Sequence, residues 1–472
     1  MIFLFLLMIC VCWKWYTRRL PGDPPAHPGN FPLIGNAHMF IGDTINFCEQ
    51  FLKMGQTCMK MGHATSIYVG PYKIYVLSDP DDICKLSNIC FEKDHFSHEF
   101  TKDLLGNGLL FGKVPVWKKH RKLINPAFNQ QILDSFMGIF NVQGKRMVQK
   151  MQVEVDKEPF DHSHYVRQIF METICLTAID NAVTEEEANK YVESFEAYLN
   201  LNISRFQKIW LHSDLIYHFS NLKKQVDECS KYLIHLSDSV LKKKRYLRAK
   251  NGYETNNENT NKNIKVFIDL MMDVDNGSLT DKEIRDELNT IIMAGHDTSA
   301  NVIVFVLLLI GSYPEVQERI YEEIKEVLQD RDVEKQDLSR LVYLEAVIKE
   351  SMRYYVMAPF IGRYIDKEVQ LKTCTLRPGH NCLLMLHAVH RNPSWGPDVN
   401  EFKPERWLDP ARMPKNPNLF VGFSIGKRNC IGKTYAMMSM KVLLCHLLRR
   451  YKLHADHTKL VVKLDVLLKP VS

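Results

Sequence analysis

The sequence has little of several patterns that would assign it to a common protein class. Its twelve cysteines are scattered, with no C-x-x-C pair and no zinc-ligand spacing. No G-x-G-x-x-G motif follows an expected strand, so the chain shows no sign of a flavin- or dinucleotide-binding domain. Its net charge of +6 is small for 472 residues, and it carries no nucleic-acid-binding signature. These absences disfavour zinc modules and nucleic-acid partners, and the cysteines are expected to be free thiols in a reducing compartment.

Long apolar runs are also scarce, and the clearest one opens the chain. Residues Ile2 to Trp13 are unbroken apolar, and Lys14, Arg18 and Arg19 follow them. No basic segment precedes the run and no small-residue cleavage site follows it, which disfavours a removed signal peptide. Charges on its carboxyl side keep the rest of the chain cytosolic by the positive-inside rule. A single-pass anchor over residues 1–17 is expected, with a shallowly inserted helix as the alternative because ~24 Å of helix falls short of a ~30 Å hydrocarbon core.

The remaining chain is expected to divide into a linker over residues 18–36 and a folded body over 37–472. Five prolines and three glycines lie between Pro21 and Gly35, which favours a stiff, non-helical segment. The composition, 46% hydrophobic and 25% charged, is ordinary for a globular protein. The length is compatible both with two or three domains and with one large α-rich unit around a cofactor.

Helical signals dominate the body, so the expected fold class is mainly α with small β-sheets. Two short strands are predicted at residues 66–70 and 73–77 around a Gly-Pro turn. Thr280 and Glu283 form a capping-box pattern, and no helix breaker follows until Pro314. A helix of about 30 residues is roughly 45 Å long and is expected to be central and buried. The other predicted elements are helices over most of 116–250 with breaks near Pro126, Pro159 and 211–220, a mobile loop over 251–263, helices from Pro314 onward, over 338–355 and over 433–451, proline-rich coil over 393–417, and a terminal hairpin over 459–468.

The most informative segment is the glycine-punctuated loop F-S-I-G-K-R-N-C-I-G from Phe423 to Gly432. Gly426 and Gly432 are expected to let the backbone turn tightly and approach a flat ring closely. N–H groups exposed by such a turn can hydrogen-bond the sulfur of Cys430 and keep it as the thiolate, the form that binds metal. Arg428 can pair with an anionic group nearby. A buried, inert thiol is the alternative, but the spacing F-x-x-G-x-R-x-C-x-G is too detailed for that interpretation.

Two further motifs precede this loop in the last third of the chain. Glu350 and Arg353 lie three residues apart on one face of the 338–355 helix, where an ordinary surface pair is the alternative. The segment F-K-P-E-R-W at residues 402–407 contains Arg406. In this order, the three motifs resemble the signatures of the cytochrome P-450 superfamily, whose haem iron takes a cysteine thiolate. The resemblance covers essentially the whole chain and implies the cytochrome P-450 fold.

The resemblance implies haem b as cofactor, between the long central helix and the C-terminal cysteine loop, with Cys430 as the axial ligand. It joins three residues into one buried network that fixes the coil before the loop: Glu350, Arg353 and Arg406. The residues that it places against the haem propionates are Trp117 and Arg121, at i and i+4 of one helix, with Arg363 and Arg428. The other residues that it places around the cofactor are Phe423, Gly426 and Gly432 of the loop and Gly295 of the long helix.

The long helix is expected to carry the oxygen-side chemistry. Gly295 costs about 1 kcal/mol relative to alanine in mid-helix and is expected to leave space for a flat cofactor. Thr298 can bond a carbonyl one turn back and loosen the helix beside the iron. Asp297 and Thr298 then offer an acid and a hydroxyl that deliver protons during oxygen activation. A capping-type Asp-Thr pair without chemistry is the alternative, and the thiolate motif favours the catalytic interpretation.

Within the superfamily, the segment Gly106 to Leu110 and the loop around Cys430 look most like the fatty-acid ω-hydroxylase branch and its insect relatives. Many members of that branch carry a glutamate, just before the glycine of the long helix, that bonds covalently to haem. Ala294 stands there in this chain, which excludes such a bond and leaves strict ω-selectivity open. Apolar segments expected to line the pocket favour a lipophilic substrate; they are 96–111, 195–220, 291–294, 356–361 and the hairpin near 460.

The expected function is a microsomal monooxygenase that inserts one oxygen atom of O2 into a fatty acid, a hormone-like lipid or a xenobiotic. Electrons are expected from NADPH through a separate flavoprotein reductase, with cytochrome b5 as a compatible further donor, at the endoplasmic reticulum membrane. A haem-thiolate isomerase or dehydratase and a non-catalytic haem-binding protein are the alternatives, and the intact Asp297 and Thr298 disfavour both. An acidic reductase is expected to dock on six lysines, for which simple solvation is the alternative: Lys118, Lys119, Lys122, Lys427, Lys433 and Lys441.

Overall fold

The computed structural model of the chain describes all residues except 1–10, 12, 14–18, 252–265, 276–278 and 472. The described residues form two compact units. One, here called the sheet unit, comprises those within Met1–Glu99, Met352–Cys430 and Leu460–Val471, and the other, the helical unit, those within Phe100–Ser351 and Ile431–Lys459. The expected anchor over 1–17, apart from Val11 and Trp13, and the expected loop over 251–263, apart from Asn251, lie outside the described residues.

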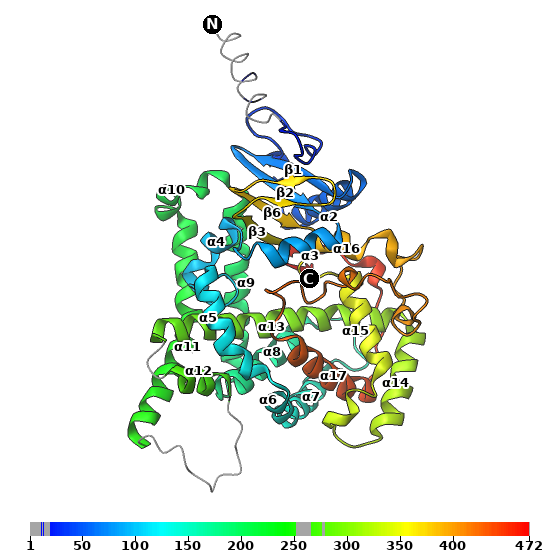
Figure 1. The fold of residues 1–472 in the computed structure, drawn as a ribbon. Coiled ribbons are helices and arrows are strands. Elements are labelled where there is room, and N and C mark those ends of the chain that lie inside the picture. The colour runs from blue at the N-terminus through cyan, green and yellow to red at the C-terminus, as the bar shows by residue number, and fades with distance from the viewer. Residues whose placement is uncertain (1–10, 12, 14–18, 252–265, 276–278, 472) are drawn as a thin grey trace. The chain divides into compact units, whose positions relative to one another are not determined.

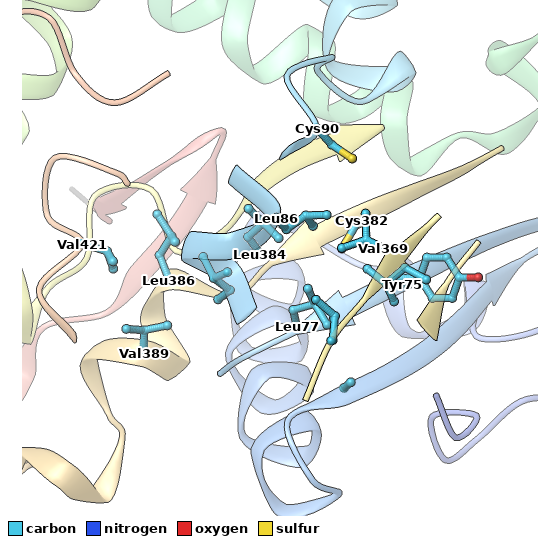
Figure 2. Packing of buried hydrophobic residues seen from close by; sticks show 14 of the residues in the cluster. Tyr75, Leu77, Leu86, Cys90, Val369, Cys382, Leu384, Leu386, Val389 and Val421 are labelled. Atoms are coloured by element: carbon cyan, nitrogen blue, oxygen red, sulfur yellow. The ribbon is translucent and has the colours of Figure 1, made fainter. Parts of the chain in front are cut away.

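The sheet unit is built on a four-stranded sheet of order β1-β2-β6-β3. β1 (Ala64–Val69) pairs antiparallel with β2 (Tyr72–Leu77), β6 (His380–Leu384) joins β2 in parallel, and β3 (Ile361–Ile365) closes the sheet antiparallel to β6. Buried side chains of these strands pack with α3 (Pro80–Ile89) and with the coil at Val421 into one apolar cluster (Figure 2). The two strands predicted around the Gly-Pro turn are confirmed.

Helices and smaller elements surround this sheet. The further elements of the sheet unit are η1 (Ala37–Phe40), α2 (Thr44–Lys60), β4 (Val369–Gln370), β5 (Thr375–Leu376), α16 (Leu386–His390), η7 (Pro393–Trp395), η8 (Pro404–Trp407), η9 (Pro417–Leu419), β7 (Val462–Asp465) and β8 (Leu467–Pro470). The antiparallel pair β7–β8 confirms the predicted terminal hairpin. Two helices, α4 (His95–Leu105) and α15 (Val342–Tyr354), contain residues of both units.

The proline-rich segment before the body is non-helical, as expected, and lies on the edge of the sheet. Backbone bridges join Ala26 to Ser66 and Gly35 to Val69. The buried carboxylate at position 23 accepts bonds from the lysine at 73 and the arginine at 377, at 3.0 and 3.1 Å. These contacts hold the segment to β1 and β2.

The helical unit contains most of the helices (Figure 1). Its elements are α5 (Val114–Ile124), η2 (Asn125–Phe128), α6 (Gln130–Ser135), α7 (Met137–Met151), η3 (Gln152–Glu154), α8 (Ser163–Ile174), the π-helical turn η4 (Cys175–Ile179), α9 (Glu185–Gln207), η5 (Ile209–His212), α10 (Asp214–His218), α11 (Asn221–Asn251), α12 (Phe267–Asp275), α13 (Asp281–Ser312), α14 (Pro314–Leu328), η6 (Lys335–Asp337), α17 (Lys433–Arg450) and η10 (His457–Lys459). The predicted breaks near Pro126, Pro159 and 211–220 coincide with η2, the coil before α8 and the short η5–α10 segment.

α13 is the long central helix predicted from its capping box. Thr280 Oγ1 accepts the N–H of Glu283 at 3.2 Å, and the Glu283 carboxylate accepts the N–H of Thr280 at 2.7 Å. In Figure 1 the helix runs through the helical unit, and it packs against α8, α11 and α12. Among the described residues it is the one helix long and apolar enough to cross a membrane, but 72% of its most apolar window is buried inside the protein. It is therefore a core helix, as expected.

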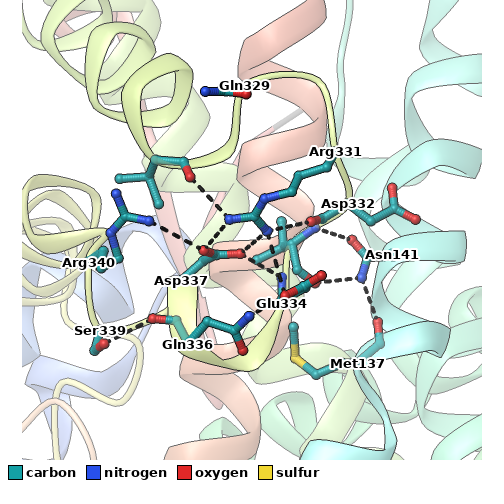
Figure 3. Close-up of polar contacts among 12 residues, drawn as sticks. Met137, Asn141, Gln329, Arg331, Asp332, Glu334, Gln336, Asp337, Ser339 and Arg340 are labelled. Carbon is teal, nitrogen blue, oxygen red and sulfur yellow. Dashed lines mark hydrogen bonds and ion pairs between the residues drawn. The ribbon is translucent and has the colours of Figure 1, made fainter.

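A buried carboxylate closes the loop between α14 and α15 (Figure 3). Asp337 is fully buried and accepts both Nη groups of Arg331, at 2.5 and 2.6 Å, and the N–H of Glu334 at 2.8 Å. Its carbonyl accepts the N–H groups of the residues three and four positions later. The predicted helix over 338–355 is therefore wrong at its start, because residues 338–341 belong to this turn and α15 begins at Val342.

Candidate functional site

Cys430 ends a loop whose backbone folds back on itself. The Cys430 N–H donates to the Phe423 carbonyl at 3.0 Å, and the Asn429 N–H donates to the Gly426 carbonyl at 3.1 Å. Cys430 is the one exposed cysteine of the ten in the described part of the chain. Burial raises the thiol pKa of most of the others, that of Cys58 for example to about 11. Cys430 is therefore the described thiol most open to an incoming metal.

The two glycines of the loop serve different purposes. Gly426 has a φ of +79°, in the left-handed region that favours glycine. A Cβ there would lie 2.6 Å from Ser87 Cβ and 2.8 Å from the Ser87 carbonyl oxygen, so the close approach at Gly426 is to α3. Gly432 has a φ of −88° at the start of α17, which any residue adopts. Both residues lie at turns or bends, as expected, but only the backbone of Gly426 requires a glycine.

Buried arginines hold the coil that leads to the loop. Arg353 donates to three backbone carbonyls of the 390–401 segment at 2.6–3.2 Å. Arg406 donates to the Trp395 carbonyl at 2.8 Å and to the Asp398 carboxylate at 3.1 Å. Glu350, three residues before Arg353 on α15, is fully buried, as are both arginines. The surface-pair alternative for Glu350 and Arg353 is therefore wrong.

Three cations gather within the sheet unit. Arg363 of β3 is fully buried; its Nη1 donates to the Gly362 carbonyl at 2.9 Å, while its Nε and Nη2 have no hydrogen-bond partner. Burial lowers the pKa of Arg363 to about 10, and burial together with Arg363 lowers the pKa of Arg428 to about 10. Desolvation and these two arginines also hold the pKa of Lys93 well below its ordinary value. The carboxylates of Asp94 and Glu92 counteract these pKa shifts.

In this cation cluster, Lys93 with Arg363 and Arg428, the two Arg363 nitrogens without a hydrogen-bond partner suit an anion, because buried charge is costly without a counter-charge. Two of its members, Arg363 and Arg428, are residues that the family resemblance places against haem propionates. Lys93 was missed, because a single lysine after a helix belongs to no motif and only its position beside the two arginines marks it.

Thr298 and Asp297 are adjacent on α13 and make different bonds. Thr298 Oγ1 donates to the Ala294 carbonyl at 2.7 Å, the predicted bond one turn back. Asp297 is buried, and its Oδ1 accepts Nδ2 of Asn301 at 2.9 Å. The same Asn301 amide donates to the Asp297 carbonyl at 2.8 Å. The hydroxyl of Thr298 is thus held along the helix, and the carboxyl of Asp297 is oriented by a fully buried amide.

Asn301 also connects Asp297 to a partly exposed ion pair of the helical unit. Its Oδ1 lies 3.5 Å from Nη2 of Arg167 in α8, and Arg167 forms an ion pair with Glu196 of α9. The Glu196 side chain is 32% exposed. Sequence reasoning missed Asn301, although its spacing of four residues from Asp297 on a helix is the signal that could have found it.

α5 carries Trp117 and Arg121 one turn apart, as predicted. Trp117 is buried, Arg121 is partly buried, and His120 between them is 1% exposed. All three belong to the helical unit, whereas the cation cluster and Cys430 belong to the sheet unit.

At Gly295, the direction in which a Cβ would project points at a neighbouring helix. A Cβ there would lie 2.5 Å from Cδ1 and 2.8 Å from Cγ1 of Ile174 in α8. Close packing of α13 on α8 therefore explains this glycine. The expectation that Gly295 leaves space for a flat cofactor is wrong.

Five of the six lysines expected at a docking face are exposed: Lys118, Lys119, Lys122, Lys427 and Lys433. Lys441 is 4% exposed; its Nζ donates to the Leu338 carbonyl at 2.6 Å and pairs with Glu345 at 2.6 Å. The expectation for Lys441 is therefore wrong, because this ammonium ties α17 to the turn before α15.

Comparison with known proteins decides the class of this site. The family model described as Cytochrome P-450 matches residues 24–470. The chain belongs to the cytochrome P-450 family. It is 29% identical to cytochrome P-450 4F12 of Homo sapiens over 490 residues, covering 98% of this chain and 93% of that protein. It is 30% identical to cytochrome P-450 4d2 of Drosophila melanogaster over 474 residues, covering 93% and 91%. These mammalian and insect relatives agree with the branch predicted from the sequence.

Membership makes this P-450 a monooxygenase, an oxidoreductase whose cofactor is haem b with a cysteine thiolate ligand. The family also implies O2, a redox partner and a lipophilic substrate. The described residues fit the cofactor, because the partnerless donors of Arg363 suit a carboxylate such as a haem propionate. The exposed thiol of Cys430 in the same unit fits the ligand.

Proposed function

We propose that this P-450 is a microsomal monooxygenase that oxidises a fatty acid, a hormone-like lipid or a xenobiotic. Its electrons would come from NADPH through a separate flavoprotein reductase, with cytochrome b5 as a compatible further donor. The family match supports the reaction class. The observation that carries the site is the exposed Cys430 in the same compact unit as the buried Arg363 and Arg428 of the cation cluster. An N-terminal anchor over residues 1–17 would hold the enzyme at the endoplasmic reticulum membrane.

Each residue of the site has a separate task in this proposal. Bound haem b supplies the iron centre at which O2 is reduced, with the thiolate favouring O–O cleavage. Cys430 would ligate the iron, and the backbone bond from its N–H to Phe423 keeps the loop in shape. Arg363 and Arg428, with Lys93 beside them, would neutralise the propionates. Trp117 and Arg121 of α5 would add donors for the same groups, and Glu350, Arg353 and Arg406 would hold the coil before the loop.

Proton supply is the proposed task of Thr298 and Asp297. Insertion of one oxygen atom releases the other as water, which consumes two electrons and two protons for each substrate oxidised. The Thr298 hydroxyl now donates to the Ala294 carbonyl and can turn to donate into the site instead. The Asp297 carboxyl, oriented by Asn301, would hold the proton that reloads this hydroxyl. Ala294 excludes a covalent haem bond at its position, so the site of oxidation would depend on substrate packing.

Replacement of the candidate ligand tests the site directly. Cys430→Ser should abolish the thiolate signature in the spectrum of the reduced, CO-bound protein, and turnover with it. Cys84→Ser, in the partly exposed cysteine of α3, is the matched control and should leave both unchanged. Retention of the thiolate spectrum in Cys430→Ser would refute the ligand assignment.

The proposed reductase dependence has its own test. Attraction between exposed lysines and an acidic partner weakens with salt, because the Debye length falls from about 10 Å at 0.1 M to about 3 Å at 1 M. Charge reversal at Lys118 and Lys433 should slow electron transfer as high salt does and leave substrate affinity intact. Reversal at Lys242, an exposed lysine of α11, is the control. A rate indifferent to salt and to the double reversal would refute docking on these lysines.

A further inference from the structure

The loop after α4 lies directly on α13, and two of its residues at this contact are glycines. A Cβ at Gly106, whose φ is +49°, would collide with the carboxyl of Asp286, and one at Gly108 would collide with the hydroxyl of Thr290. The side-chain-free backbone therefore rests against one face of α13. Gly106 and Gly108 belong to the segment that resembles the ω-hydroxylase branch, and nothing in the oxygen chemistry above uses them.

Two neighbouring carboxylates of α13 accept the N–H groups of this loop. Asp286 Oδ2 accepts the N–H of Asn107 at 3.1 Å, and Glu287 Oε2 accepts the N–H of Leu109 at 3.0 Å. Asp286 is 5% exposed and Glu287 is fully buried. Burial raises the pKa of both carboxyls, and the loop N–H groups and, for Glu287, His120 counteract that rise. Carboxylates are rarely found in a protein interior unless they bind specific partners.

The second oxygen of Glu287 reaches a different element. Glu287 Oε1 lies 2.6 Å from Nδ1 of His120, which is 1% exposed on α5. The ring N–H donates when Glu287 is ionised, and the opposite ring nitrogen lies 3.6 Å from Glu283. His120 stands between Trp117 and Arg121, so a single carboxylate of α13 joins the loop and α5 to the central helix.

We propose that Glu287, assisted by Asp286 and His120, is a positioning residue that clamps the loop 106–111 and α5 onto α13 and thereby sets the rate at which haem is lost. The proposal rests on the proposed function in one respect, namely that Trp117 and Arg121 of α5 bind the propionates. Loss of the Glu287 carboxylate leaves the buried N–H of Leu109 without its acceptor and removes the bond that joins His120 of α5 to α13. Both losses favour an opened loop and a displaced α5.

The test measures the clamp and the haem separately in the haem-loaded full-length protein. Glu287→Leu removes both acceptor oxygens and should speed amide hydrogen exchange in peptides covering residues 106–111 by about tenfold or more, the factor expected for a lost charge-assisted bond. Haem transfer to excess apomyoglobin should accelerate by a similar factor. Glu172→Leu is the matched control, because Glu172 is a buried carboxylate of the same unit that pairs with Arg146 and does not touch the loop.

Glu287→Gln keeps the shape and one acceptor oxygen, so it provides the test if Glu287→Leu does not fold. It should accelerate both exchange and haem transfer less than Glu287→Leu and more than Glu172→Gln. Unchanged exchange over 106–111 in the Glu287 variants, or equal effects in the Glu172 variants, overturns the clamp. That outcome is distinct from failure of the proposed function, which a wild-type protein without a thiolate haem spectrum would reveal.

Discussion

Replacement of Arg363 by methionine should change the stability of the haem-free and the haem-loaded protein in opposite directions. In the described structure this arginine is fully buried, and two of its nitrogens have no hydrogen-bond partner. Methionine has a similar length, carries no charge and needs no partners. Without haem the substitution removes a buried, incompletely paired cation; with haem it removes a counter-charge for a propionate.

The magnitudes follow from the contacts of Arg363. Each unsatisfied buried donor costs about 1–3 kcal/mol, and the bond from Nη1 to the Gly362 carbonyl contributes about 1 kcal/mol. With two such donors, the haem-free protein should therefore gain about 1–5 kcal/mol in its free energy of unfolding. A hydrogen bond to a charged group is worth about 1.5–3 kcal/mol, so haem should be lost roughly 10- to 150-fold faster.

Urea unfolding of the haem-free protein and haem transfer to apomyoglobin measure the two effects. Arg406→Met is the control, because Arg406 is equally buried but bonded to Trp395 and Asp398. It should destabilise the protein both with and without haem. A haem-free Arg363→Met protein that is less stable than wild type, or unchanged haem transfer, would refute the counter-charge role of Arg363.

Further substitutions test three other parts of the structure. Asp337→Asn should lower the free energy of unfolding by about 1–2 kcal/mol in urea titrations. Bonds from Arg331 lower the pKa of that carboxyl, so its stabilisation is complete above its unfolded pKa of about 4 and is lost as pH falls through the lowered folded pKa; a deficit that does not shrink as pH falls from 5 to 3 would contradict this. Gly295→Ala should cost about 1–3 kcal/mol by overpacking, and Ile174→Val should recover part of it, whereas additive losses would exclude the contact. Asn301→Leu should preserve the CO spectrum but lower product formed per NADPH, and unchanged coupling would exclude an orienting role for the amide.

Local signals in the sequence determined most of the secondary structure. The capping box at Thr280 and the breaker at Pro314 bound α13 because a helix end depends on residues a few positions away. The cysteine loop could be recognised for the same reason, since Phe423, Gly426 and Cys430 are nearly contiguous. The start of α15 was misplaced because Asp337 bonds the backbone locally and competes with helical periodicity.

The tertiary structure alone decided which partner each side chain has. Gly295 looks the same in the sequence whether it admits a cofactor or a neighbouring helix, and only Ile174 of α8 shows which. The contact of Lys441 with Leu338 joins residues 103 positions apart, and that of His120 with Glu287 joins residues 167 apart. Periodicity and motif spacing report which face of an element is apolar, but burial and pairing of a charge depend on which distant segment covers it.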